Sequence, residues 1–209
     1  MLKLANAFLA AIVATALTVP AFAQQPAPQN VRVRGTVEAL NGDTLTVVSR
    51  DGQKLDIKMQ PNWTVQSVIA VKPEEVQAGD FVGASATKRA DGKMVAEAIH
   101  YLDFIPAANR DAAHGDIPWD LTPQSLMINA DSGTVVKASD GTMTLKMTHS
   151  KATYDLIITP QTPIVKYREG SKALLVKGAW VFIGTQKQPD GTYTATLVRA
   201  ETNGVKPPL

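Results

Sequence analysis

The sequence predicts an all-β protein of two tandem five-stranded OB-like barrels after a cleaved signal peptide. Its first support is an internal repeat: "RGTVEALNGDTLTV" begins at Arg34, and "SGTVVKASDGTMTL" begins at Ser132. Its second is the alternation of apolar and polar residues in these stretches, which is typical of half-buried antiparallel strands. Its third is a series of Asn-Gly and Asp-Gly dipeptides, which favour tight hairpin turns.

The repeat is continuous over most of the chain. The segment Gly35-Thr36-Val37 returns as Gly133-Thr134-Val135, and after one inserted residue the offset between the copies becomes 99. Each copy runs for roughly 70 residues, a size at which a small domain can just fold alone. We therefore expect one barrel over residues 31–102 and a second barrel over residues 131–202.

Five strands are expected in each copy. Between the third and fourth, the stretches 71–80 and 169–178 could each form one helical turn. Three meandering strands, a short helical crossing and a hairpin give the strand order of an OB-type barrel. The expected strands cover residues 31–40, 43–50, 53–60, 79–88 and 93–102, then 132–139, 142–149, 152–159, 178–187 and 192–201.

These motifs resemble a family of exported bacterial β-barrel domains of unknown function. The shared pattern is G-x-V-x-x-x-x-G/D-x-x-L/M-T-V/L, a later G-D/A-x-V and a closing D-G-x-x-x-A. The resemblance implies OB-like domains, often in tandem, and its motifs are turn and core residues that carry no chemistry. Ala179 stands in the second copy where the first has Asp80, which weakens any shared role for that aspartate.

The two ends of the chain predict segments outside the barrels. Residues 1–23 combine Lys3, an apolar run and a final "AFA", the marks of a signal peptide. The mature chain is then expected in the periplasm or secreted, with a flexible start at 24–30 and a loose tail at 203–209. The chain has no cysteine, so disulfides and thiolate metal sites are excluded.

Charge and motifs argue against several function classes. Without Lys3, 20 of the 21 basic residues remain against 19 acidic ones, so the balance favours neither nucleic acid nor an anionic membrane surface. No later stretch is apolar enough to span a membrane. No nucleophile–base arrangement is recognisable, and we expect no enzyme activity. His100 corresponds to Arg199 in the second copy, which predicts a solvated side chain at a strand end.

Two groups of residues could hold a metal ion. In "MTLKMTH", Met147 and His149 share a strand face with Met143, and thioether and imidazole groups suit Cu(I). Met143 corresponds to Leu45 and is expected in the core. Met143 is too far from His149 along the strand to share an ion with it unless the strand bends, whereas Met147 and His149 could share one.

The second group lies in the linker between the copies, residues 103–130. Asp111, His114, Asp116 and Asp120 could bind a divalent cation there, although their spacing matches no established calcium loop. Apolar residues in the same stretch favour a packing role instead, in which the linker staples the two barrels together.

The function expected from these observations is a non-catalytic binding or scaffolding module of the cell envelope. Its partner would be an envelope protein or polymer, without nucleic acid, membrane span or cofactor. The alternative is a metal-handling protein that captures or delivers copper or another divalent metal ion through Met147, His149, His114, Asp116 and Asp120.

Overall fold

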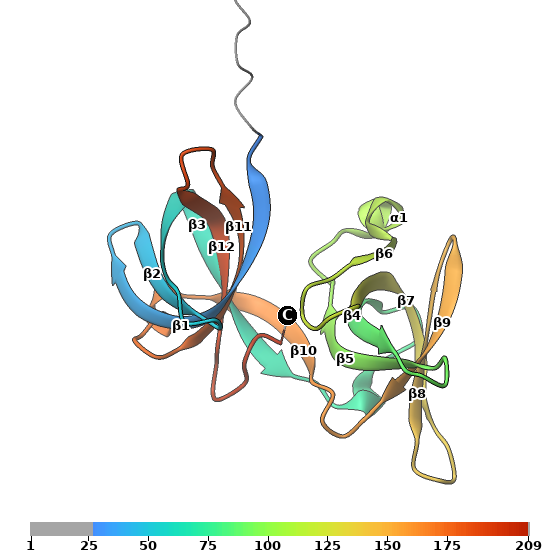
Figure 1. Cartoon of the computed structure of the whole chain (residues 1–209). Coiled ribbons are helices and arrows are strands. Elements are labelled where there is room, and N and C mark those ends of the chain that lie inside the picture. The colour runs from blue at the N-terminus through green and yellow to red at the C-terminus, as the bar shows by residue number, and fades with distance from the viewer. Residues whose placement is uncertain (1–26, 209) are drawn as a thin grey trace, which may run out of the picture.

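The structure is a computed structural model that describes residues 27–208, and nearly all of its regular elements are strands (Figure 1). The predicted signal peptide lies outside the described residues. No helix within residues 27–208 is long and apolar enough to cross a membrane. The first half contains β1 (Gln29–Asn41), β2 (Thr44–Ser49), β3 (Lys54–Ala70), β4 (Phe81–Lys88) and β5 (Met94–Tyr101). The rest contains α1 (Arg110–Ala113), β6 (Gly115–Pro118), β7 (Leu126–Lys137), β8 (Met143–His149), β9 (Ala152–Ile158), β10 (Ile164–Gly170), β11 (Trp180–Lys187) and β12 (Tyr193–Ala200).

The strands close into two five-stranded barrels, which Figure 1 shows side by side. In barrel A, strand pairing runs β1–β2–β3–β12–β11 and returns to β1. In barrel B it runs β7–β8–β9–β5–β4 and returns to β7. Both rings have the order expected of an OB-type barrel, in which the fifth strand of the repeat lies between the third and the fourth.

Each barrel combines strands from both copies of the repeat, contrary to the expected boundaries of 31–102 and 131–202. Barrel A takes β1–β3 from the first copy and β11–β12 from the second, and barrel B takes the complementary strands. The apolar cores follow the same division. Val47 packs with Val181 in one core, whereas Val82 packs with Leu145 in the other. The expected strands were largely correct, but each copy exchanges its last two strands with the other copy.

A crossing of two strands between the barrels makes this exchange possible. β3 is 17 residues long, and its second half leaves barrel A and pairs antiparallel with β10. Val68 of β3 pairs with Tyr167 of β10, which stands 99 positions later and occupies the same place in the second copy. A pair of equivalent residues in an antiparallel ladder lies on a twofold axis. The two copies are therefore related by a pseudo-twofold axis between Val68 and Tyr167.

Local features of the repeat agree with the sequence. Three-residue 3₁₀ turns form at Pro73–Glu75 and Lys172–Leu174, where helical turns were expected. Gly35 is required by close packing, because a Cβ atom there would lie 2.1 Å from the carbonyl oxygen of Val48. The glycine therefore permits the tight coiling of β1 against β2.

Both described ends of the chain make contacts with the rest of the fold. Gln29 and Asn30 belong to β1 and pair with Lys187 and Gln186 of β11. Near the other end, Val205 packs against a small cluster that contains Val68 and Tyr167. Residues 29–30 therefore lie in β1 and Val205 lies against the crossing, within the stretches where a flexible start and a loose tail were expected.

His100 is buried, although its correspondence with Arg199 predicted a solvated side chain. It retains 6% exposure, because β10 pairs beside it and the ring of Tyr167 lies 5.9 Å from its own ring. The guanidinium group of Arg199 lies over the ring of Tyr167, 4.4 Å from the centroid of that ring. Burial, followed by the charge of Arg199, lowers the pKa of His100 from its ordinary value of 6.5 to about 3. The unpredicted crossing strand therefore keeps this histidine neutral.

The exchange of strands predicts which engineered disulfide can form. Asn30 pairs with Gln186 across β1 and β11, and facing Cα atoms in antiparallel strands lie about 4.5–5.5 Å apart, within disulfide reach. In the cysteine-free chain, Asn30→Cys with Gln186→Cys should oxidise to an intramolecular disulfide, detected as a mass loss and faster mobility on non-reducing gels. The control is Asn30→Cys with Thr87→Cys. Thr87 is the counterpart of Gln186 in the first copy, so it would face Asn30 if each copy formed a barrel of its own. Efficient bridging of the control pair would contradict the exchange.

The depressed pKa of His100 predicts a loss of stability in mild acid. The unfolded chain binds this proton near pH 6.5 and the folded chain only near pH 3, so stability is present above pH 6.5 and is lost as the pH falls. The loss approaches about 1.4 kcal/mol per pH unit in that window, or about 2 kcal/mol between pH 6.5 and 5. When the free energy of unfolding is measured with urea at several pH values in this range, it should change clearly less with pH for His100→Gln than for the wild-type chain. An unchanged slope would mean that other groups cause the acid sensitivity.

Candidate functional site

The linker between the copies contacts both barrels. It contains α1 and the short strand β6, which pairs with β7 of barrel B. A few residues later, the carbonyl oxygens of Asp120 and Leu121 accept hydrogen bonds from Arg50 of barrel A. Trp119 and Leu121 also pack on Ala98, Met127 and Phe182, which come from both barrels. This geometry corresponds to the staple that the apolar residues of the linker predicted.

At barrel B, the linker brings together two of the predicted metal ligands. The Nε2 atom of His149 lies 3.3 Å from an Asp116 carboxylate oxygen, and the His149 side chain is fully buried. Its Nδ1 atom accepts a hydrogen bond from the backbone N–H of Lys151. Asp116 also approaches Tyr154; burial and this carboxylate raise the pKa of the phenol. The contact between Asp116 and His149 therefore holds β6 against the end of β8.

The other predicted ligands lie in separate places. Met147 is fully buried in the core of barrel B. His114 faces Asp131, with 3.4 Å between Nε2 and a carboxylate oxygen, while Asp111 lies 3.7 Å from its Nδ1 atom. Within residues 27–208, no three His, Cys, Asp or Glu side chains form a group that could hold a metal ion. The metal-handling alternative remains a prediction, and its proposed ligands are not gathered around one point.

At barrel A, Asp120 meets a group of arginines instead. Its two carboxylate oxygens accept hydrogen bonds of 3.2 Å and 2.8 Å from Arg34, whose side chain is only 5% exposed. Arg32 lies 3.6 Å from the same carboxylate and stacks on the Trp119 ring, 3.7 Å from its centroid. A bidentate arginine–carboxylate pair is a strong and directional contact, so Asp120 fixes the linker on barrel A.

The arginines control the ionisation of Asp120. Burial alone would raise its pKa, but the hydrogen bonds and charge of Arg34, together with the charge of Arg32, outweigh burial and lower the pKa below its ordinary value. Asp120 is therefore ionised at neutral pH. Two guanidinium groups share its single negative charge, so the pair of arginines is only partly neutralised.

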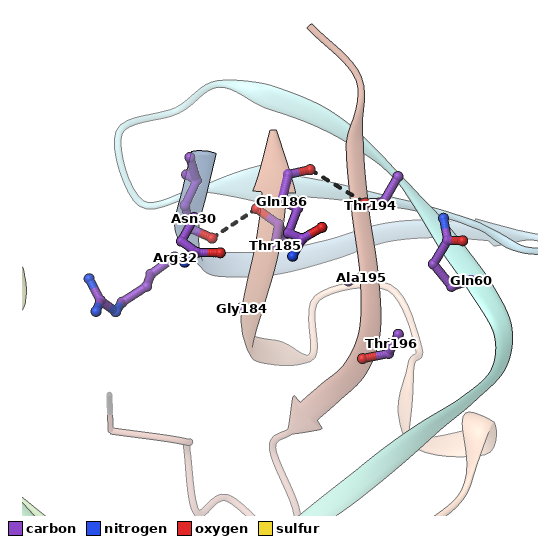
Figure 2. A pocket seen from close by; sticks show the side chains of 10 residues that line it. Asn30, Arg32, Gln60, Gly184, Thr185, Gln186, Thr194, Ala195 and Thr196 are labelled. Atoms are coloured by element: carbon purple, nitrogen blue, oxygen red, sulfur yellow. Dashed lines mark hydrogen bonds between the residues drawn. The ribbon is translucent and has the colours of Figure 1, made fainter. Parts of the chain in front are cut away.

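Two pockets adjoin one another at this end of barrel A, with Val31 and Arg32 in the lining of both. The first, which we call the arginine pocket, has a volume of about 330 Å³ and contains Arg34, Arg50 and Asp120. The second, which we call the amide pocket, has a volume of about 430 Å³ (Figure 2). Its polar lining consists mainly of side-chain amides and hydroxyls, from Asn30, Gln60, Thr185, Gln186, Thr194 and Thr196.

The amide pocket lies where β11 and β12 separate. These strands pair at Phe182 and Arg199 and again at Gln186 and Thr194, with unequal numbers of residues between. Figure 2 shows Gln186 and Thr194 close to each other at one side, while Arg32 extends away from the other labelled side chains. Amide and hydroxyl groups can donate and accept hydrogen bonds without carrying charge. The pocket is therefore suited to hydrogen bonding with a polar, uncharged group.

The three arginines of this pocket all come from the first copy. In the strand pairing of barrel B, Asp131 and Thr148 stand where Arg34 and Arg50 stand in barrel A, and Asn129 stands at the place of Arg32. Sequence reasoning had singled out Asp120 but missed the arginines, because they are far from the linker in sequence and resemble ordinary strand residues. The absence of basic side chains at the equivalent positions was the signal that could have identified them.

Comparison with known proteins assigns only part of the chain. Residues 34–100 match a family described as "Domain of unknown function (DUF5666)". The match covers less than half of the chain and corresponds to the first copy of the repeat, whose strands β1–β3 and β4–β5 lie in different barrels. Neither the curated proteins nor the solved structures contain a match.

The contact between Asp120 and Arg34 predicts a measurable contribution to stability. Asp120→Asn removes the charge that neutralises a buried guanidinium, and it should lower the free energy of unfolding by about 2 kcal/mol. The matched control is Asp103→Asn, which breaks the pair with Arg168 in which both side chains are partly exposed. That change should cost less than about 1 kcal/mol. Chemical denaturation compares the two variants. Equal losses of unfolding free energy would show that the ion pair of Asp120 with Arg34 is no stronger than a surface ion pair.

Proposed function

We propose that this protein is a non-catalytic binding or scaffolding module of the cell envelope, whose ligand lies across the amide and arginine pockets of barrel A. The observation that carries the proposal is the lining of the amide pocket, to which four strands contribute amide and hydroxyl side chains. Such a lining can exchange hydrogen bonds with the hydroxyl and amide groups of a polymer. The lining therefore favours an envelope polymer over an envelope protein as the partner.

The architecture supports a role in binding. Closed barrels supply a rigid frame, and the strands that line the amide pocket belong to one barrel although they come from both copies of the repeat. A site on a rigid frame presents its polar groups in fixed positions, which reduces the entropy lost on binding. The expected export of the chain, based on residues 1–23, would bring this surface into contact with envelope material.

A sedimentation assay with isolated peptidoglycan tests the proposed function. The mature chain should co-sediment with this polymer, and Gln60→Ala combined with Asn30→Ala should weaken the association about tenfold, because each change removes a hydrogen-bonding partner. The matched control is Thr148→Ala on barrel B, which changes an exposed hydroxyl of β8 and should leave the association unchanged. If the wild-type chain remains in solution, or if the control is as damaging as the double variant, the proposed site is wrong.

A further inference from the structure

We propose that the arginine pocket binds a carboxylate group of an acidic glycan, and that Asp120 occupies this site when the glycan is absent. The proposal rests on the proposed function, because it names the chemical class of ligand for part of the same surface. It assigns Asp120 the role of an internal substitute for the ligand, supplied by a linker that belongs to neither copy of the repeat.

The pocket has the chemistry of a carboxylate receptor. Arg34 is almost completely buried and presents two donors to Asp120 in the bidentate geometry that suits a carboxylate. Its Nε atom is buried and has no hydrogen-bond partner. A buried cation with an unfilled donor is costly unless an anion compensates it. The site therefore already holds one carboxylate against a buried guanidinium whose hydrogen bonding is incomplete.

Asp120 is held in a way that permits its replacement. Its side chain remains 48% exposed, and it lies outside the strands of both barrels. Arg50 holds the same segment only through carbonyl contacts of 3.2 Å and 3.3 Å. A ligand carboxylate could therefore approach from solvent and take over the hydrogen bonds of Arg34 without any strand having to move.

The local charge favours a second anion. Arg32, Arg34 and Arg50 line the pocket, whereas its acidic residues are Asp120 and Asp51. Asp51 accepts a hydrogen bond of 2.5 Å from Ser49 at the exposed edge, so it lies against its own turn. Three positive charges against two negative ones leave an excess that an incoming carboxylate would neutralise, most strongly at low ionic strength.

The amide pocket indicates a glycan as the source of the carboxylate. It shares Val31 and Arg32 with the arginine pocket, so one chain could place a carboxylate on Arg34 and its neighbouring sugar hydroxyls against Asn30 and Gln60. An acidic peptide could provide the carboxylate, but it would not need a row of amide and hydroxyl partners beside it. We therefore assign the site to an acidic glycan and treat an acidic peptide as the competing result.

Isothermal titration of the mature chain with trigalacturonic acid tests the proposal. Removal of the internal carboxylate by Asp120→Asn should strengthen binding about tenfold, because the free site no longer has to expel its own occupant. Arg34→Gln should abolish binding, and the control Asp103→Asn should leave it unchanged. Added salt should weaken binding in every variant that binds.

Further measurements keep the test decisive if a variant is unstable. Thermal unfolding reports whether Asp120→Asn and Arg34→Gln are folded. If either variant does not fold, Arg32→Gln and Arg50→Gln replace it, because these side chains are more exposed than that of Arg34. Each of them should bind the ligand more weakly than the wild-type chain does. In wild type, ligand should also alter the fluorescence of Trp119, which stacks on Arg32; Trp119→Phe identifies this signal.

Each of four results would overturn the proposal. Unchanged or weaker binding by folded Asp120→Asn would show that Asp120 is no substitute for the ligand. Equal binding of maltotriose would show that the carboxylate is irrelevant, and preference for triglutamate would assign the site to an acidic peptide. If trigalacturonic acid fails while peptidoglycan still co-sediments through Gln60 and Asn30, the acidic-glycan proposal is lost and the proposed function stands. Failure of both assays removes both.

Discussion

The antiparallel crossing of β3 and β10 is the contact on which the rest of the structure depends. It pairs Val68 with its own counterpart, Tyr167, and carries the chain from one barrel to the other. Because the crossing separates the third strand of each copy from its fourth and fifth, neither core is complete without residues from both copies. Contacts between residues far apart in sequence therefore close each barrel, and we expect the two barrels to form cooperatively.

The linker adds a second connection, with different chemistry at its two ends. At barrel B, Asp116 faces a buried histidine and helps to hold β6 in place. At barrel A, Asp120 faces the buried Arg34 and the partly solvated Arg32, whose two positive charges it only partly neutralises. The first contact involves a fully buried histidine side chain, and the second opens onto two adjoining pockets. This difference is why the proposed ligand site lies on barrel A, although the two barrels have the same strand order.

Asymmetry between the copies carries the functional argument. The residues that repeat, such as Gly35 and the alternating apolar positions, build strands and cores. The residues that do not repeat gather at special places: His100 and Arg199 flank Tyr167 at the crossing, and the three arginines meet the linker. A duplicated frame can retain its packing while surface positions in one copy acquire other chemistry.

The sequence by itself determined the strands, the hairpin turns and the order of strands in each barrel, because alternation and turn residues act over a few neighbouring positions. It also identified the linker and Asp120 as places of interest. Only the tertiary structure decided that the copies exchange strands, since each copy offers the same inward-facing pattern and either partner satisfies it. The burial of His100 and the union of Arg32, Arg34 and Arg50 with Asp120 follow from that exchange and from the path of the linker. Such contacts span distances along the chain at which local patterns carry no information.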